Sequence, residues 1–202
     1  MTGLFLSRPG WLGELRSAAM ALAGHGWPVL RGTFRASERW CGRPDAVGLR
    51  PVDDDWSAAW TLRTVQAANW WNDQPYGALL VCGLGVDCIE LPGSHSRRML
   101  APLREAGLRP PAMITPVGTM VLFARTYAGS RPCLVSVSLR SAGSWVAVPP
   151  TDQHSHGSRA SGYRWLPDAT PGALGWVLPE LGPVCELITS TIQRAAGAAR
   201  DM

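Results

Sequence analysis

Two acidic side chains, Asp87 and Glu90, lie in the stretch VDCIELP, directly after the apolar run YGALLVCGLG. Carboxylates at the end of a buried strand could bind the divalent cations of a phosphoryl-transfer site, in which acids surround two ions about 3.5–4 Å apart. Side chains alternate between the two faces of a strand, so residues three apart point to opposite sides. Without a bulge, Asp87 and Glu90 are therefore expected not to bind the same ion.

A second candidate for metal binding is the polar loop 151–162, where His154 and His156 are two residues apart. An extended backbone would project both rings from one face. Two histidines without a third nearby ligand are weak grounds for a metal site, and a surface loop rich in Ser, Gly and Arg is the alternative interpretation.

Three consecutive acids at 53–55 stand directly before the segment 56–71, WSAAWTLRTVQAANWW. We expect Asp55 to be the N-cap of a helix over this segment, with its neighbours favourably placed at the positive end of the helix, rather than a metal ligand. Four tryptophans at helical spacing would then serve the core or an interface rather than base stacking: Trp56, Trp60, Trp70 and Trp71.

The composition excludes several kinds of chemistry. All 19 basic residues are Arg, so no lysine is available as a Schiff base or in a phosphate-binding loop. The five cysteines contain no CxxC pair, which argues against structural zinc and favours buried free thiols. No nucleophile elbow, Walker loop, HExxH or Rossmann glycine pattern occurs. The net charge of +4 permits contact with phosphate.

The length of 202 residues and the 46% hydrophobic content predict one compact domain, 1–202, with a real core. No apolar run approaches the roughly 20 residues that cross a bilayer. The opening segment, which carries Glu14, does not have the pattern of a signal peptide. We therefore expect a cytoplasmic protein that makes no membrane contact.

Helical and extended patterns alternate along the chain. Helices are expected at 13–24, 56–71, 96–107 and, as an amphipathic helix, 183–199, whereas 33–49 is expected to be loop. Strands are expected at 27–32, twice within 78–91 around a glycine turn, in a hairpin over 111–126, and at 133–140 and 144–150. This order predicts an α+β fold with a mixed, mostly antiparallel sheet packed by helices.

Taken in order, several pieces resemble the N-terminal domain of bifunctional DNA primase/polymerases, within the archaeo-eukaryotic primase superfamily. ALAGHGWPVLRG resembles the opening helix and strand, and WWNDQPYGALLVCG the W-x-x-x-P-x-G/A-N-hydrophobic element. VDCIELP resembles the strand of the first catalytic motif, and ITPVGTMVLFA the T-P-S-G-G-x-H-hydrophobic segment. GSWVAVPPT and SGYRWLPD resemble G-G-Y-V-V-A-P-P-S and Y-x-W-x-x-P. The resemblance covers about 15–170 and leaves 171–202 as a C-terminal extension.

The resemblance implies a primase-polymerase fold with a two-metal site, but the site positions differ from the family pattern. The two acids of the first motif align with Glu90 and Pro92, the nucleotide-contacting His with Val121, and the third acid with Ser138. Asp87 lies outside the aligned pair. VDCIELP is thus expected to be the remnant of a metal site in a diverged, actinobacterial-type member, with Glu90 and Asp87 as the catalytic candidates and no metal bound.

Three functions stay open. The first is a domain that has lost nucleotidyl transfer, needs no cofactor, and binds single-stranded or primed DNA, or a nucleotide. Its expected contacts are arginines, whose forked guanidinium suits phosphate: Arg125, Arg131, Arg140, Arg159 and Arg164. The second is a protein-interaction module, for a homodimer or another protein partner, anchored by tryptophans. The third is an active DNA primase/polymerase with Mg²⁺ or Mn²⁺ on rearranged ligands, Asp87, Glu90 and Asp152.

Overall fold

This computed structural model describes residues 10–36, 38–126, 137–152 and 162–198. Its strands form three sheets. The three-stranded sheet has the order β1 (Val29–Gly32), β4 (Gly77–Val81), β9 (Trp145–Ala147). The five-stranded sheet has the order β10 (Arg164–Trp165), β6 (Ala112–Ile114), β7 (Met120–Arg125), β5 (Val86–Leu91), β8 (Ser138–Arg140). A small hairpin pairs β2 (Phe34–Ala36) with β3 (Arg39–Cys41). The paired strands run antiparallel, which confirms the expected α+β class with mostly antiparallel sheets.

Strands that follow each other in the sequence do not always pair. β4 and β5 are joined by a short turn, yet they belong to different sheets, and so do β8 and β9. Gly83, with φ +88°, lies in the first turn and lets the chain leave one sheet and enter the next. The two turns are joined by a hydrogen bond from the Cys82 N–H to the Ser144 carbonyl, 3.0 Å long.

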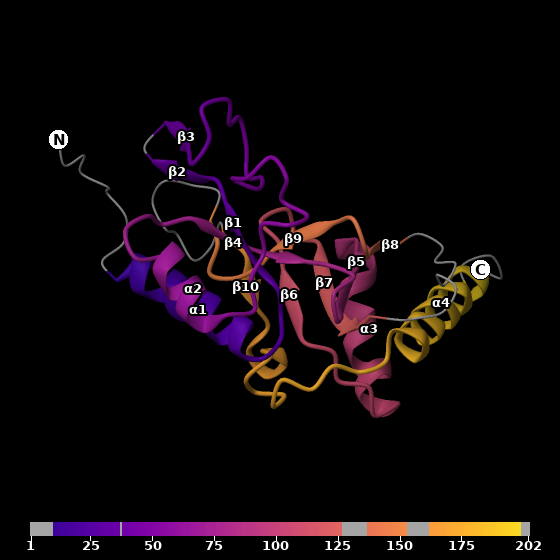
Figure 1. Cartoon of the computed structure of the whole chain (residues 1–202). Helices are drawn as coiled ribbons and strands as arrows, with labels where there is room; N and C mark the ends of the chain where they lie inside the picture. Colours follow the sequence, from indigo (N-terminus) through magenta and orange to yellow (C-terminus); the bar gives the residue numbers. More distant parts are fainter. Residues whose placement is uncertain (1–9, 37, 127–136, 153–161, 199–202) are drawn as a thin grey trace.

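Helices cover the two ends of this arrangement (Figure 1). α1 (Trp11–Gly24) packs beside α2 (Thr64–Trp70), while α3 (Gly93–Glu105) packs beside α4 (Leu181–Ala198). The five-stranded sheet separates two hydrophobic cores, because alternate residues of β5 enter each of them. Val86 and Cys88 join the core of α1 and the three-stranded sheet, whereas Ile89 and Leu91 join that of α3 and α4. None of the helices in the described ranges is both long and apolar enough to cross a membrane.

The helix expected over 56–71 is shorter than the pattern indicated. α2 begins at Thr64 and its N-cap is Arg63, so the expectation that Asp55 caps a helix there was wrong. The chain before it is held extended, since Thr61 exchanges backbone hydrogen bonds of 3.0 and 2.9 Å with Val29. The Asp55 carboxylate instead accepts a 2.7 Å hydrogen bond from the Ser57 hydroxyl.

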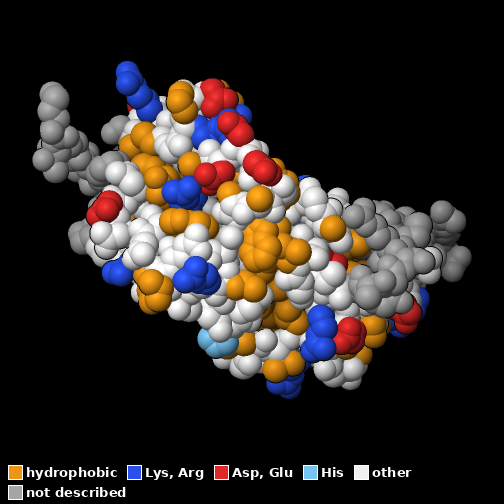
Figure 2. All heavy atoms as spheres, viewed as in Figure 1, with side chains coloured by type: hydrophobic (Ala, Val, Ile, Leu, Met, Phe, Trp, Pro, Cys, Tyr) orange, Lys and Arg blue, Asp and Glu red, His pale blue; other side chains and the backbone are white. Residues whose placement is uncertain are grey.

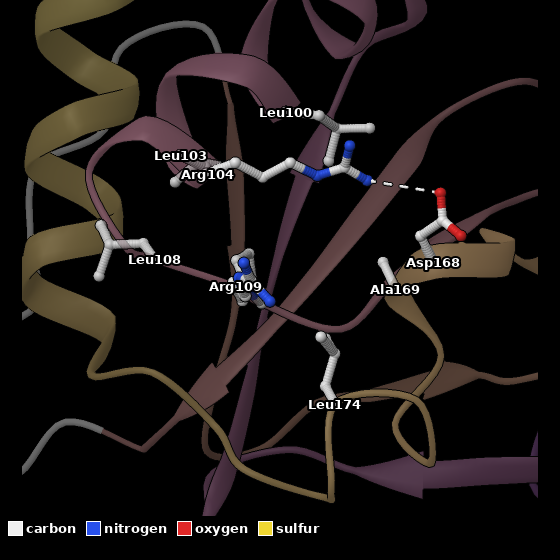
Figure 3. A pocket seen from close by; sticks show the side chains of 9 residues that line it. Leu100, Leu103, Arg104, Leu108, Arg109, Asp168, Ala169 and Leu174 are labelled. Atoms are coloured by element: carbon white, nitrogen blue, oxygen red, sulfur yellow. Dashed lines mark ion pairs between the residues drawn. The ribbon is translucent and has the colours of Figure 1, made fainter.

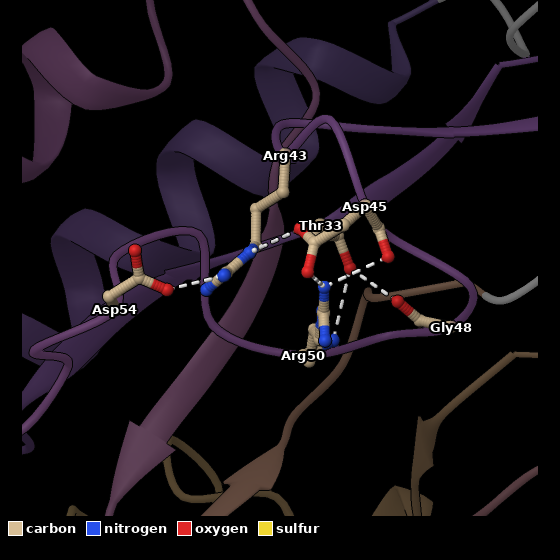
Figure 4. Close-up of polar contacts among 6 residues, drawn as sticks. All are labelled: Thr33, Arg43, Asp45, Gly48, Arg50 and Asp54. Atoms are coloured by element: carbon tan, nitrogen blue, oxygen red, sulfur yellow. Dashed lines mark hydrogen bonds and ion pairs between the residues drawn. The ribbon is translucent and has the colours of Figure 1, made fainter.

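The segment expected to be loop contains the β2–β3 hairpin and a cluster of ion pairs (Figure 4). Asp45 lies between Arg43, at 3.1 Å, and Arg50, at 2.5 Å, and Arg43 also pairs with Asp54. Hydrogen bonds from Arg50 and then Arg43 lower the pKa of Asp45 to about 2. These carboxylates are therefore compensated by arginines and hold the loop together.

The Thr151 side chain is hydrogen-bonded to the backbone at the start of β4. Its side chain is fully buried, and its hydroxyl accepts from the Ala78 N–H at 2.8 Å and donates to the Ala78 carbonyl at 3.1 Å. Thr151→Val keeps the shape but leaves that N–H without this acceptor, so we expect a loss of about 1–3 kcal/mol in the free energy of unfolding. Urea denaturation measures it.

The matched control is Thr64→Val, because Thr64 is exposed at the start of α2. It should change the free energy of unfolding by less than about 0.5 kcal/mol. Equal effects of the two substitutions would contradict the role given to the buried hydroxyl.

Candidate functional site

A row of directly paired residues crosses the five-stranded sheet at Glu90. Glu90 on β5 is paired with Val121 on β7 and with Ser138 on β8. Residues directly opposite each other on antiparallel strands project to the same face. The positions that resemble the family's first acid, its histidine and its third acid therefore lie side by side, although 48 residues of sequence separate Glu90 from Ser138. Here they carry one carboxylate, one isopropyl group and one hydroxyl.

Asp87 projects from the other face of the same strand. The pairing of β5 with β7 continues without interruption from Val86↔Arg125 to Leu91↔Met120, so no bulge turns Asp87 toward Glu90. Asp87 is only 1% exposed, and its carboxylate accepts from the hydroxyls of Thr126, at 3.4 Å, and Ser141, at 3.3 Å. A single metal ion cannot bind both acids in this register.

Arg140 on β8 compensates the charge of Glu90. Its Nε donates to one carboxylate oxygen at 3.1 Å and its Nη2 to the other at 3.3 Å. The pair is partly shielded, with 23% of the Glu90 side chain and 47% of the Arg140 side chain exposed. The hydrogen bond to Glu90 raises the pKa of Arg140, so this guanidinium keeps its charge.

The residues on this face do not fit the pair of divalent cations that the resemblance implies. One carboxylate is available, and both of its oxygens are engaged by a guanidinium. Within the described part of the chain, no group of three or more His, Cys, Asp or Glu side chains is arranged to hold a metal ion. His154 and His156 lie outside the described residues.

Glu90 and Arg140 line a pocket of about 410 Å³ that we call the β5–β9 pocket, because both larger sheets contribute to it. Its walls include three aromatic side chains, Trp56, Trp145 and Tyr163, all partly buried. The remaining lining residues are Thr115, Gly143, Ser144, Val146 and Ala147. The volume lies within the roughly 300–1,000 Å³ of small-molecule sites. Aromatic planes beside one guanidinium could bind a flat, anionic ligand.

Two of the other expected arginine contacts are described by the structure, and neither lines this pocket. Arg125 is exposed and pairs with Glu180 on the approach to α4, at 3.3 Å. Arg164 is exposed on β10, at the opposite edge of the sheet from β8. Arg131 and Arg159 lie outside the described residues. Figure 2 shows hydrophobic side chains gathered in the middle of one face, with the described arginines on that face scattered among acids around them.

The described cysteines are free thiols, as the sequence predicted, and all of them except the partly exposed Cys41 are buried. Cys82 and Cys88 face each other with their sulfurs 3.8 Å apart, both buried. Burial raises the pKa of the Cys88 thiol well above its usual value, and it raises that of Cys185 to about 12. Both thiols therefore stay protonated at neutral pH, which removes the thiolate that covalent catalysis needs.

Gly83 positions the turn that follows Arg140. A Cβ at Gly83 would lie 2.4 Å from the Cα and 2.5 Å from the N of Ala142, and the backbone has φ +88°. Gly83→Ala should therefore displace the turn, lower the free energy of unfolding by about 2–3 kcal/mol and disturb the Glu90–Arg140 pair. Thermal and urea unfolding followed by circular dichroism measure this.

Gly85 is the control, since it has φ +97° and no atom lies within 4 Å of the place that a Cβ would take. Gly85→Ala meets the backbone strain alone and should cost about 1–2 kcal/mol. If Gly83→Ala lowers the free energy of unfolding no more than Gly85→Ala does, the backbone around Ala142 moves away from the added Cβ at no cost in free energy.

The fold defines an α+β domain with mostly antiparallel sheets, and the paired row places one carboxylate, Glu90, on a face of the larger sheet. A family model described as bifunctional DNA primase/polymerase, N-terminal, matches residues 19–179, and the chain belongs to this family. A search of curated proteins finds none that matches the chain.

Proposed function

We propose that this domain has lost two-metal nucleotidyl transfer and binds a nucleotide unit, of single-stranded nucleic acid or of a free nucleotide, in the β5–β9 pocket. The observation that carries the proposal is the bidentate Glu90–Arg140 pair on the strand that resembles the family's first catalytic motif. Glu90 balances the charge of Arg140 and holds its guanidinium at the pocket, where a nitrogen that Glu90 does not use can donate a hydrogen bond to a ligand.

The loss of metal chemistry is supported by the donor set. Divalent cations of this type bind through several oxygens, usually including more than one carboxylate. Val121 offers no donor atom, and Ser138 offers a neutral hydroxyl. Glu90 alone cannot offset the cost of removing water from two cations, and its charge is already balanced by Arg140.

The ligand class is supported by an unused hydrogen-bond donor on Arg140 and by the aromatic side chains that line the pocket with it. Nε and Nη2 are used by Glu90, whereas Nη1 has no hydrogen-bond partner among the described residues. A phosphate oxygen can accept from that group, with the bases stacked on Trp56, Trp145 or Tyr163. Stacking on an aromatic side chain contributes about 1–3 kcal/mol per base, and it does not require a particular sequence.

Fluorescence anisotropy tests this proposal with three labelled probes. They are single-stranded DNA of about 20 nucleotides, the same strand with a primer annealed, and an adenosine nucleotide. We expect binding that is unchanged by EDTA and weakens between about 50 and 200 mM salt. Arg140→Ala should weaken it about tenfold, because a charge-assisted hydrogen bond contributes about 1.5–3 kcal/mol. The DNA and nucleotide arms show which source of the nucleotide unit is bound.

Arg63→Ala is the control, since Arg63 is exposed at the start of α2 and does not line the pocket. Loss of binding in EDTA, or equal weakening by Arg63→Ala and Arg140→Ala, would contradict a metal-independent site at Arg140. Absence of binding at low salt would contradict the proposed function as a whole.

A further inference from the structure

An apolar groove lies on the face of the five-stranded sheet opposite to Glu90, between α3, the turn Pro167–Ala169 and the segment before α4. Its inner part has a volume of about 210 Å³ and its outer part about 550 Å³. Leu108, Arg109 and Leu174 line both parts, so the two are continuous, and we call them together the α3 groove.

The inner part is built from aliphatic side chains (Figure 3). Leu103 and Ala169 form its buried floor, at 1% and 6% exposure, and belong to the core of α3 and α4. Leu100, Leu108 and Leu174 pack against that core and form the walls. A volume of about 210 Å³ is smaller than the roughly 300–1,000 Å³ of sites for whole small molecules, and it suits one large apolar side chain.

Two arginines and two acids line the α3 groove, and Arg109 is the one of these four described residues without an ion pair. Arg109 is exposed and has no ion-pair or hydrogen-bond partner among the described residues, and it lies in the middle of the pocket in Figure 3. Arg104 forms an ion pair with Asp168 at 4.0 Å (Figure 3), and Glu180 forms one with Arg125. An arginine in this state favours a carboxylate, with which it forms two parallel hydrogen bonds.

We propose that the α3 groove binds the C-terminal end of an acidic peptide chain from a partner protein. In the last residue of a chain, the side chain and the α-carboxylate are attached to the same Cα atom. This places an apolar group within reach of the inner part while the carboxylate contacts Arg109. The preceding residues follow the outer part past Val177 and Pro179, and their acidic side chains are attracted by Arg109.

A fluorescein-labelled peptide, Glu-Asp-Glu-Leu-Phe with a free C-terminal carboxylate, tests this by anisotropy on the full chain. We expect micromolar binding that weakens about tenfold or more when the C-terminus is amidated, when the last Phe is replaced by Ala, or when Arg109→Glu is introduced. Leu174→Gln should weaken the peptide with Phe more than the peptide with Ala. Circular dichroism confirms that each variant is folded.

Arg98→Glu is the matched control: it makes the same charge change at an exposed position of α3 that does not line the groove. The proposal is overturned by absence of binding at about 1 mM peptide, by equal affinity for the amidated peptide, or by equal weakening from Arg98→Glu and Arg109→Glu. Because the groove and the β5–β9 pocket lie on opposite faces of the sheet, Arg109→Glu should leave DNA binding unchanged. The two proposals can therefore fail separately.

Discussion

Trp27→Ala is expected to lower the free energy of unfolding by about 3–5 kcal/mol, because it removes a large buried ring that the surroundings cannot replace. Trp27 is 2% exposed and lies between α1 and β1. Its ring centroid is 5.2 Å from that of Phe123 on β7, 6.4 Å from that of Trp165 on β10 and 5.8 Å from that of Trp176. The Trp27 ring therefore packs the segment between α1 and β1 against two strands of the five-stranded sheet.

The measurement is urea denaturation monitored by far-UV circular dichroism, with Trp40→Ala as the control. Trp40 is half-exposed on β3 and belongs to none of the described core clusters. Trp40→Ala should lower the free energy of unfolding by less than about 1.5 kcal/mol. If the two substitutions have the same effect, the aromatic cluster around Trp27 does not hold the two sheets together.

Local geometry made part of the site predictable from the sequence. The alternation of side chains on a strand is set by covalent structure, and the register of β5 does place Asp87 and Glu90 on opposite faces. Apolar spacing likewise predicted α1 and α4, whose stripes bury Leu15 and Val184. Each of these features depends on neighbours within a few residues.

Contacts between distant residues could not be predicted in this way. Glu90 and Arg140 are 50 residues apart, and only the pairing of β8 with β5 brings them together. Thr151 was not singled out, because nothing near it in the sequence indicates a bond to Ala78, 73 residues away. The expected helix over 56–71 failed for the same reason, since a pairing with β1 holds Thr61 extended.

The pocket walls are the clearest example of residues that local patterns missed. Helical spacing alone indicates a role for Trp56, whereas Trp145 and Tyr163 lie in pieces that resemble the family, and no local pattern places the three around one pocket. The signal that the sequence offered was the order of the family-like pieces, which includes the segments of Glu90, Trp145 and Tyr163 but does not itself place them side by side. Pairing in the sheets converts that order into one pocket.

The second large effect concerns catalysis: the wild-type protein is expected to extend no primed template with Mg²⁺ or Mn²⁺. Metal-assisted phosphoryl transfer requires cations held on both the attacking and the leaving oxygens. The row Glu90, Val121 and Ser138 provides one carboxylate for that purpose, and Arg140 occupies it. Denaturing gel electrophoresis of a labelled primer after incubation with all four nucleotides measures the product.

Arg140→Ala separates the two reasons for this inactivity. If the arginine alone kept cations out, the variant would gain metal-dependent extension, because it frees the oxygens of Glu90. We expect no product from it, since Val121 and Ser138 still add no charged ligand beside Glu90. Extension by the wild type that Glu90→Ala abolishes would contradict the proposed loss of catalysis. Extension by Arg140→Ala alone would instead make Arg140 an inhibitor of a site that is otherwise complete.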